Sequence, residues 1–242
     1  MFQRFSFTAI CLFTTLLVIA QAPTNAVVFY NAGLDHATKG SFPEAILSFK
    51  KAVELYKKYD LAYAEMGNAY QKSSKPDSAL LSYKAALALN PTMANVHLAM
   101  GNTYRVQKKQ SDEAINCYMK ALETDSSNKV TFYGLAWCYN DKKEYDKAIV
   151  YAIKALGIDN SYRVAYNEIA HAFNKTKKYA EGIAQFKKNM AVSTVDLQYY
   201  FSGLCYIELK DKAGALMMHE ELLRLNEKAA ASLKKKIDAA VF

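Results

Sequence analysis

Residues 60–93 decide the fold, and they read DLAYAEMGNAYQKSSKPDSALLSYKAALALNPTM. Small and apolar side chains in the first half recur at the spacing of one helix face: Tyr63, Met66, Gly67 and Tyr70. After a polar break at residues 72–76, a second helical face follows: Ala79, Leu80, Tyr83 and Leu87. The stretch therefore predicts two antiparallel helices, each about 13 residues or about 20 Å long.

The same pattern recurs along the chain. Small residues mark it at steps of 34, 34, 35, 34 and 33: Gly33, Gly67, Gly101, Ala136, Ala170 and Gly203. A ring stands three residues after each: His36, Tyr70, Tyr104, Tyr139, Phe173 and Tyr206. The small residues let an aromatic side chain of the neighbouring helix fill the space where two helices cross closely. A helix pair cannot cover its own apolar face, so we expect six units that stack into a solenoid with one continuous core.

In these residues the chain resembles a tetratricopeptide repeat protein. The second unit carries every position of the family's pattern: Tyr63, Met66, Gly67, Tyr70, Ala79, Tyr83, Ala86 and Pro91. The other units depart from the pattern at a few places, namely His97, Ala152, Asn189 and Leu222, and Pro91 is the only terminating proline. The resemblance covers residues 26–225 and implies an all-α, right-handed α-solenoid of antiparallel helix pairs.

The two ends of the chain differ from the repeats. Residues 1–25 combine one early arginine, an apolar run and small residues, which is typical of a secretory signal peptide. Cleavage could follow Ala20 or Ala26, and an uncleaved N-terminal anchor is the alternative. At the other end, residues 226–242 carry Leu233, Ile237 and Val241 at every fourth place, beside Lys234 to Lys236. We expect a capping helix there, with a membrane-surface helix as the alternative.

No motif for catalysis, metal or cofactor binding stands out. The sequence has no phosphate-binding glycine loop, no HExxH and no paired CxxC, and its histidines are scattered over different units. Beyond the signal only Cys117, Cys138 and Cys205 remain, which favours buried thiols over a disulfide framework. Lys plus Arg number 31 against 23 acidic residues, a net charge of +8, but the export signal disfavours nucleic acid as the partner.

The resemblance implies a binding surface. In this family the first helices of the units line a concave groove that holds extended peptides or partner helices. The matching positions form an asparagine-rich row around the only tryptophan: Asn68, Gln71, Asn102, Arg105, Tyr133, Trp137, Asn140, Asn167, His171 and Asn174. Amides both donate and accept hydrogen bonds, and the rings provide apolar area, so the row suits a peptide. The lysine clamp by which some members hold chaperone tails is not expected, because no unit has lysine at the fifth place.

These observations predict an exported, non-catalytic scaffold, periplasmic or secreted, that binds a protein or peptide partner in its groove. It would meet a membrane only through an uncleaved N-terminal segment, and no cofactor or metal is expected. The alternative is a protein that binds an oligosaccharide or another cell-envelope polymer through the same asparagines and rings. Three lysine pairs end first helices, at 108–109, 142–143 and 177–178. They indicate either solvated helix ends or a basic edge that recruits an acidic partner.

Overall fold

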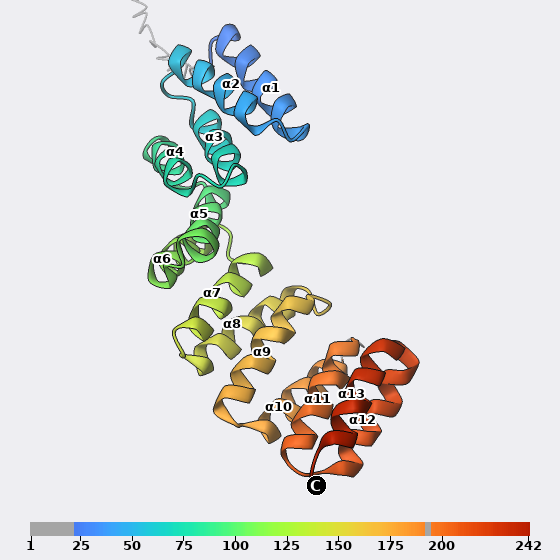
Figure 1. Ribbon diagram of the computed structural model, residues 1–242. Helices are drawn as coiled ribbons and strands as arrows, with labels where there is room; N and C mark the ends of the chain where they lie inside the picture. The colour runs from blue at the N-terminus through green and yellow to red at the C-terminus, as the bar shows by residue number, and fades with distance from the viewer. Residues whose placement is uncertain (1–21, 192–194) are drawn as a thin grey trace, which may run out of the picture.

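The computed structural model describes residues 22–191 and 195–242, and this part of the chain is helical throughout, without strands. The helices are α1 (Thr24–Thr38), α2 (Phe42–Leu55), α3 (Asp60–Lys72), α4 (Pro76–Leu89), α5 (Ala94–Asn102), a π-helical segment η1 (Thr103–Lys108), α6 (Ser111–Thr124), α7 (Lys129–Asp141), α8 (Tyr145–Ile158), α9 (Arg163–Thr176), α10 (Tyr179–Met190), α11 (Asp196–Glu208), α12 (Lys212–Leu225) and α13 (Glu227–Ala239). They follow one another in chain order along a curved array (Figure 1). The prediction of an α-solenoid of helix pairs is confirmed.

The two helices of each unit lie on different sides of the array. The first helices contact one another from unit to unit, as α7 does α9 and α9 does α11. Successive second helices make no more than marginal contact within the described residues. The first helices are therefore closer together and form the inner, concave side, while the second helices spread over the outer side.

Glycine on a first helix makes room for a ring from its partner helix. A Cβ atom on Gly33 would lie 2.5 Å from the ring of Phe49, and one on Gly67 would lie 2.5 Å from the ring of Tyr83. Both rings are fully buried. The expected steric role of the small residue is confirmed at these two positions, because a Cβ atom there would overlap the ring; at Gly203 the neighbouring side chain is Leu233 instead.

A residue in the left-handed conformation follows the end of each first helix by one or two positions. The residues recur with the repeat and have φ between 53° and 76°: Gly40, Ser74, Lys109, Lys143, Lys177 and Lys210. Only the first unit uses glycine, which adopts this conformation without steric cost. One lysine of each predicted pair thus occupies the turn between the two helices of its unit.

The other lysine of each pair joins neighbouring units. Lys108 forms an ion pair with Asp77 at 2.9 Å, and Lys178 forms one with Asp146 at 2.9 Å. Lys142 bonds to Asp112 in the same way. These pairs are exposed and therefore weak individually, but they show that the lysine pairs serve turns and unit-to-unit contacts.

The third unit carries one extra residue within its first helix. Ala114 lies thirteen residues after Gly101, whereas the equivalent step is twelve in the other five units. The structure absorbs the extra residue in η1, where the helix widens to π geometry directly after α5. Pi-helical turns of this kind are frequent at functional sites. Here the π-helical segment contains Arg105. At the same boundary, α4 packs less extensively against α5 than other second helices pack against the first helix of the next unit.

The last helix covers the open end of the solenoid. In α13, Ala230, Leu233 and Ile237 are buried against the helices α11 and α12, and Leu233 lies against Gly203. At its start, the side chain of Asn226 accepts a hydrogen bond from the Ala229 amide. None of the helices in the described part is long and apolar enough to span a membrane.

The predicted signal peptide lies almost wholly outside the described residues, which begin at Ala22. Of residues 22–25, Thr24 and Asn25 already belong to α1. Ala26 is fully buried against Ala52, Val53, Tyr59 and Ala62. The first helix therefore begins before the second of the two expected cleavage points.

Candidate functional site on the concave face

The ten predicted residues lie on the first helices of the four middle units. Asn68 and Gln71 are on α3, Asn102 ends α5, and Arg105 is in η1. The others follow on α7 (Tyr133, Trp137, Asn140) and α9 (Asn167, His171, Asn174). The structure thus places them on successive helices of the inner side, although only some line a common hollow.

Two adjoining hollows bring the second half of the row together. The smaller, of about 360 Å³, is lined by Trp137, Asn140, Asp141, Asn167, Glu168 and His171. The larger, of about 470 Å³, shares Asn167 and His171 and continues over Asn174, Phe201 and Cys205 to Lys236 of the last helix. Asn167, His171 and Asn174 are exposed there. These hollows extend the site beyond the predicted row, to the apolar residues of α11.

Tyrosines from the second helices hold two of the asparagines. The hydroxyl of Tyr83 bonds to Asn68 Oδ1 at 2.8 Å, and that of Tyr118 bonds to Asn102 Oδ1 at 2.9 Å. Both rings are fully buried and pass beside the glycine that precedes the asparagine. Burial raises the pKa of each phenol far above its ordinary value, so both hydroxyls keep their protons. In the second and third units the glycine and the asparagine therefore work together: the glycine admits the ring whose hydroxyl orients the amide.

Arg105 is held from three sides. Its Nε donates to the Tyr118 hydroxyl at 3.1 Å. The guanidinium carbon lies 5.3 Å from the ring centroid of Tyr133 and 5.3 Å from that of Trp137, which is within the range of cation–π attraction. The side chain is half-buried, and these contacts place the guanidinium between the third and fourth units.

Gln71 and Asn140 are already engaged within the protein. Gln71 Nε2 donates to Thr103 Oγ1 at 2.8 Å, and the backbone carbonyl of Gln71 accepts from Gln107 Nε2 at 3.0 Å. These bonds connect α3 to η1. They lie at the boundary between the second and third units, where α4 packs less extensively against α5 than second helices do at the other boundaries. Gln71 therefore stabilises the contact between the second and third units.

The amide of Asn140 is buried and points in a fixed direction. Its Nδ2 donates to the Glu168 carbonyl at 3.0 Å and to Glu168 Oε2 at 2.8 Å. Because a backbone carbonyl only accepts hydrogen bonds, the positions of Nδ2 and Oδ1 in the Asn140 side chain cannot be exchanged. Burial raises the pKa of Glu168, although the bond from Asn140 opposes this shift. The Asn140–Glu168 pair thus couples α7 to α9 beneath the smaller hollow.

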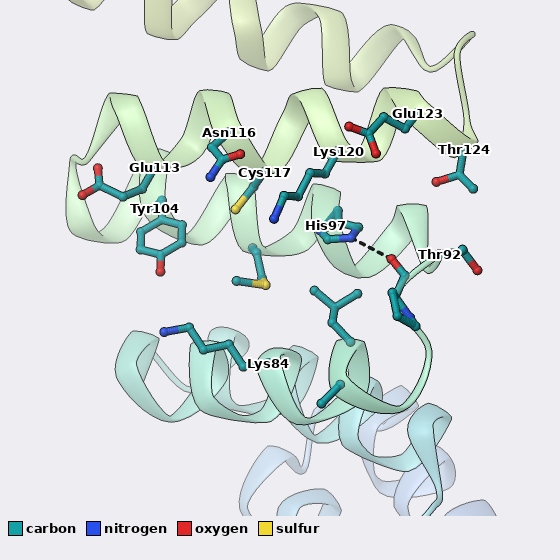
Figure 2. A pocket seen from close by; sticks show the side chains of 14 residues that line it. Lys84, Thr92, His97, Tyr104, Glu113, Asn116, Cys117, Lys120, Glu123 and Thr124 are labelled. Carbon is teal, nitrogen blue, oxygen red and sulfur yellow. Dashed lines mark hydrogen bonds between the residues drawn. The ribbon is translucent and has the colours of Figure 1, made fainter.

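A third hollow lies on the outer side and was not expected from the sequence. It has a volume of about 810 Å³ and lies between α4 and α6 over α5 and η1. Figure 2 shows α6 along one side, with Glu113, Asn116, Cys117 and Lys120, and Lys84 on the opposite side. His97 borders it and is fixed by a bond between its Nε2 and the Pro91 carbonyl at 3.0 Å. The signal that could have located this hollow is the 35-residue step, because the extra residue lies in the helix beneath it.

The three cysteines in the described part of the chain are buried thiols, as the sequence indicates. Burial raises the pKa of Cys117 to about 11, that of Cys138 to about 12 and that of Cys205 to about 11. Thiols with such values remain protonated and unreactive at neutral pH. Within the ranges that the structure describes, no three His, Cys, Asp or Glu side chains group together as metal ligands would.

The comparisons with known proteins agree with this architecture. A family model described as tetratricopeptide repeat matches residues 61–93, 94–128 and 131–162. No curated protein matches the chain at the level of sequence.

Three solved structures illustrate the likeness. The MamA protein is 21% identical over 84% of this chain and 96% of that chain, with a TM-score of 0.61. PilF of Pseudomonas aeruginosa is 18% identical over 88% of this chain and 97% of that chain, with a TM-score of 0.63. YrrB, described as a TPR protein with an unusual peptide-binding site, is 23% identical over 77% of this chain and 97% of that chain, with a TM-score of 0.60. At these identities the likeness concerns the fold alone, and the family model shows that three of the units of this chain are similar to tetratricopeptide repeats.

Proposed function

We propose that this protein is a non-catalytic scaffold that binds an extended peptide segment of a partner protein on its concave face. The observation that carries the proposal is the row of oriented polar groups and rings on successive first helices. Asn68 and Asn102 are each fixed by a buried tyrosine, and Trp137 lines the smaller hollow, which adjoins the larger hollow that reaches α11. Side chains that are fixed before binding lose little entropy on binding, which favours affinity.

The chemistry of the row suits an extended chain. A peptide in extended conformation exposes both N–H and C=O groups along its length, and amide side chains can pair with either. The apolar part of the larger hollow, with Phe201 and Leu204, can receive a side chain of the peptide. YrrB, which has a similar fold, is described as having a peptide-binding site.

Selection from a displayed library of short peptides tests the proposal. Peptides selected on the purified protein should lose affinity by about tenfold or more when Trp137 or Asn167 is replaced by alanine. Matched controls on the outer side are Leu81→Ala and Val150→Ala, whose side chains are 69% and 51% exposed on second helices. These two should change the affinity less than twofold. Equal losses of affinity for the concave-face variants and the outer-side controls would contradict the proposal, as would the selection of no peptide.

A glycan-binding role is the second candidate. Exposed Asn167, His171 and Asn174 lie beside Tyr179 and Phe201 in the larger hollow, and amides next to rings also suit sugar hydroxyls. A glycan array probed with the same protein discriminates the two functions. The glycan-binding function would be favoured if an oligosaccharide bound saturably, if Asn167→Ala abolished this binding, and if no peptide were selected on the same protein.

We also propose that the protein is exported and cleaved after Ala20. Cleavage after Ala26 would remove the first residues of α1, including Ala26, which is fully buried. Cleavage after Ala20 leaves the helix intact. N-terminal sequencing of the protein from its own cells should begin at Gln21; a first residue of Met1 would indicate an anchor, and Val27 would contradict the structural argument.

A further inference from the structure

Arg105 is a cation without a carboxylate partner. Of the three arginines in the described residues, Arg163 pairs with Asp196 and Arg224 pairs with Glu221 at 3.3 Å, whereas Arg105 forms no ion pair. Its hydrogen bond is made by Nε alone, to Tyr118. Within residues 22–191 and 195–242 the two terminal nitrogens have no acceptor, and they do not belong to the buried polar atoms that lack a partner. They therefore face solvent on the concave side.

The direction of the guanidinium is set before any ligand arrives. Tyr118 binds one edge, and the rings of Tyr133 and Trp137 lie at equal distances of 5.3 Å from the guanidinium carbon. An arginine that is already stacked and bonded loses little freedom when its remaining fork of N–H groups binds an anion.

A second donor is fixed beside it by the same tyrosine. Because arginine only donates, the Tyr118 oxygen accepts from Arg105 and its own O–H donates to Asn102 Oδ1. The amide of Asn102 is thereby oriented with its Nδ2 away from Tyr118. Arg105 and Asn102 therefore offer N–H donors, and a partner group must supply acceptors.

The nearby acidic residue does not satisfy this need. Glu168 acts on Arg105 electrostatically, but its carboxylate accepts from Asn140 Nδ2 at 2.8 Å and forms no ion pair with Arg105. The arrangement leaves a positively charged, donor-only position among the amides and rings of the predicted row.

We infer that Arg105, assisted by Asn102, binds the carboxylate of an aspartate or glutamate side chain within the peptide. This rests on the proposed function and specifies the peptide that the concave face selects. Terminal guanidinium nitrogens match a carboxylate with two parallel hydrogen bonds. Arg105 lies in the third of six units, with Asn68 on one side and Trp137 to Asn174 on the other. The peptide thus continues in both directions, so an internal side chain reaches the position and a C-terminal carboxylate does not.

The experiment compares peptides selected on the unaltered protein and on Arg105→Gln. Peptides from the unaltered protein should share an acidic residue at one position, and changing that residue to its amide should weaken binding about tenfold. On Arg105→Gln the same change in the peptide should have no effect. Arg105→Lys should restore only part of the preference, because lysine keeps the charge and loses the fork.

Two controls separate this inference from general attraction to a basic protein and from failure of the proposed function. Arg224→Gln removes the same charge from an exposed pair on α12 and should leave the preference intact. Peptides that bind the concave face without an acidic position, or an acidic preference that survives in Arg105→Gln, would overturn the inference and leave the peptide-binding function standing. If the protein preferred peptides with a free C-terminus over the same peptides with an amidated C-terminus, the inference of an internal carboxylate would be overturned, and the terminal carboxylate would be the group that Arg105 binds. No selected peptide at all would remove both.

Discussion

The ring of Tyr118 occupies the space that a side chain at Gly101 would need. A Cβ atom on Gly101 would lie 2.5 Å from Tyr118 Cε1, and one on Gly134 of the next unit would lie 2.5 Å from Cζ of the same ring. The tyrosine passes between two units and delivers its hydroxyl to Asn102 and Arg105 on the concave face. Core packing and the candidate site therefore depend on the same side chain.

Gly101→Ala should destabilise the fold. The methyl group would overlap a fully buried ring that has no free direction to move, and overpacking of this kind costs about 1–3 kcal/mol. Chemical denaturation monitored by circular dichroism measures the effect. Gly157→Ala is the matched control, because nothing lies within 4 Å of that position in α8. It should raise the free energy of unfolding by about 0.5–1 kcal/mol, since alanine favours helix; a loss at both positions would contradict the steric explanation.

Tyr118→Phe should affect both stability and binding. It leaves Asn102 Oδ1 and Arg105 Nε without their partner and should lower the free energy of unfolding by about 1–2 kcal/mol. It should also weaken the preference for acidic peptides, because the guanidinium loses one of its three supports. Tyr83→Phe removes the equivalent bond to Asn68 but touches no arginine. It should lower stability similarly and leave the acidic preference unchanged in a fluorescence anisotropy titration.

Lys143→Gly should stabilise the protein. Lys143 has φ of 62°, a conformation that is strained for lysine and free for glycine. The strain relieved exceeds the entropy that glycine loses, and the expected gain is about 0.5–1 kcal/mol. Lys142→Gly is the control, because Lys142 has φ of −74° and bonds to Asp112. Thermal melts should show a rise for the first variant alone; no rise would contradict the role assigned to these turns.

The stability of the protein should depend on the protonation of Glu168. Burial raises the pKa of this carboxyl above its ordinary value of 4.5. The folded state therefore binds the proton more tightly, and this contribution is fully present below about pH 4.5 and lost as pH rises through the folded pKa. Glu168→Gln keeps an acceptor for Asn140 without titrating, so its advantage over the unaltered protein should grow from acidic to neutral pH. The control Glu144→Gln should show the opposite sign, because Lys147 lowers the pKa of the exposed Glu144. A difference for Glu168→Gln that does not vary with pH would contradict the assignment.

The sequence predicted the architecture well because its signals are local and repeated. The series from Gly33 to Gly203 and the rings that follow it locate the first helices and their spacing without any long-range information. The position of the concave face followed from the family resemblance. The roles of the lysine pairs did not, because residues such as Lys142 and Asp112 meet only when consecutive units stack.

The finer features of the site depend on contacts between units. The 35-residue step was visible, but only the structure shows that η1 absorbs the extra residue and places Arg105 between Tyr133 and Trp137. Likewise, Gln71 and Asn140 were expected as free groove residues, and the structure adds that Thr103 and Glu168 already engage them. Their part in binding a partner stays a prediction.

Trp137 offers the most direct measurement of peptide binding on the concave face, because it is the chain's only tryptophan. Its ring stands beside Arg105 and borders the smaller hollow, so a bound peptide should change its environment. Titration with a selected acidic peptide should produce a saturable change in tryptophan emission, with the same dissociation constant as anisotropy of the labelled peptide. Binding by anisotropy with unaltered emission would place the peptide elsewhere on the protein.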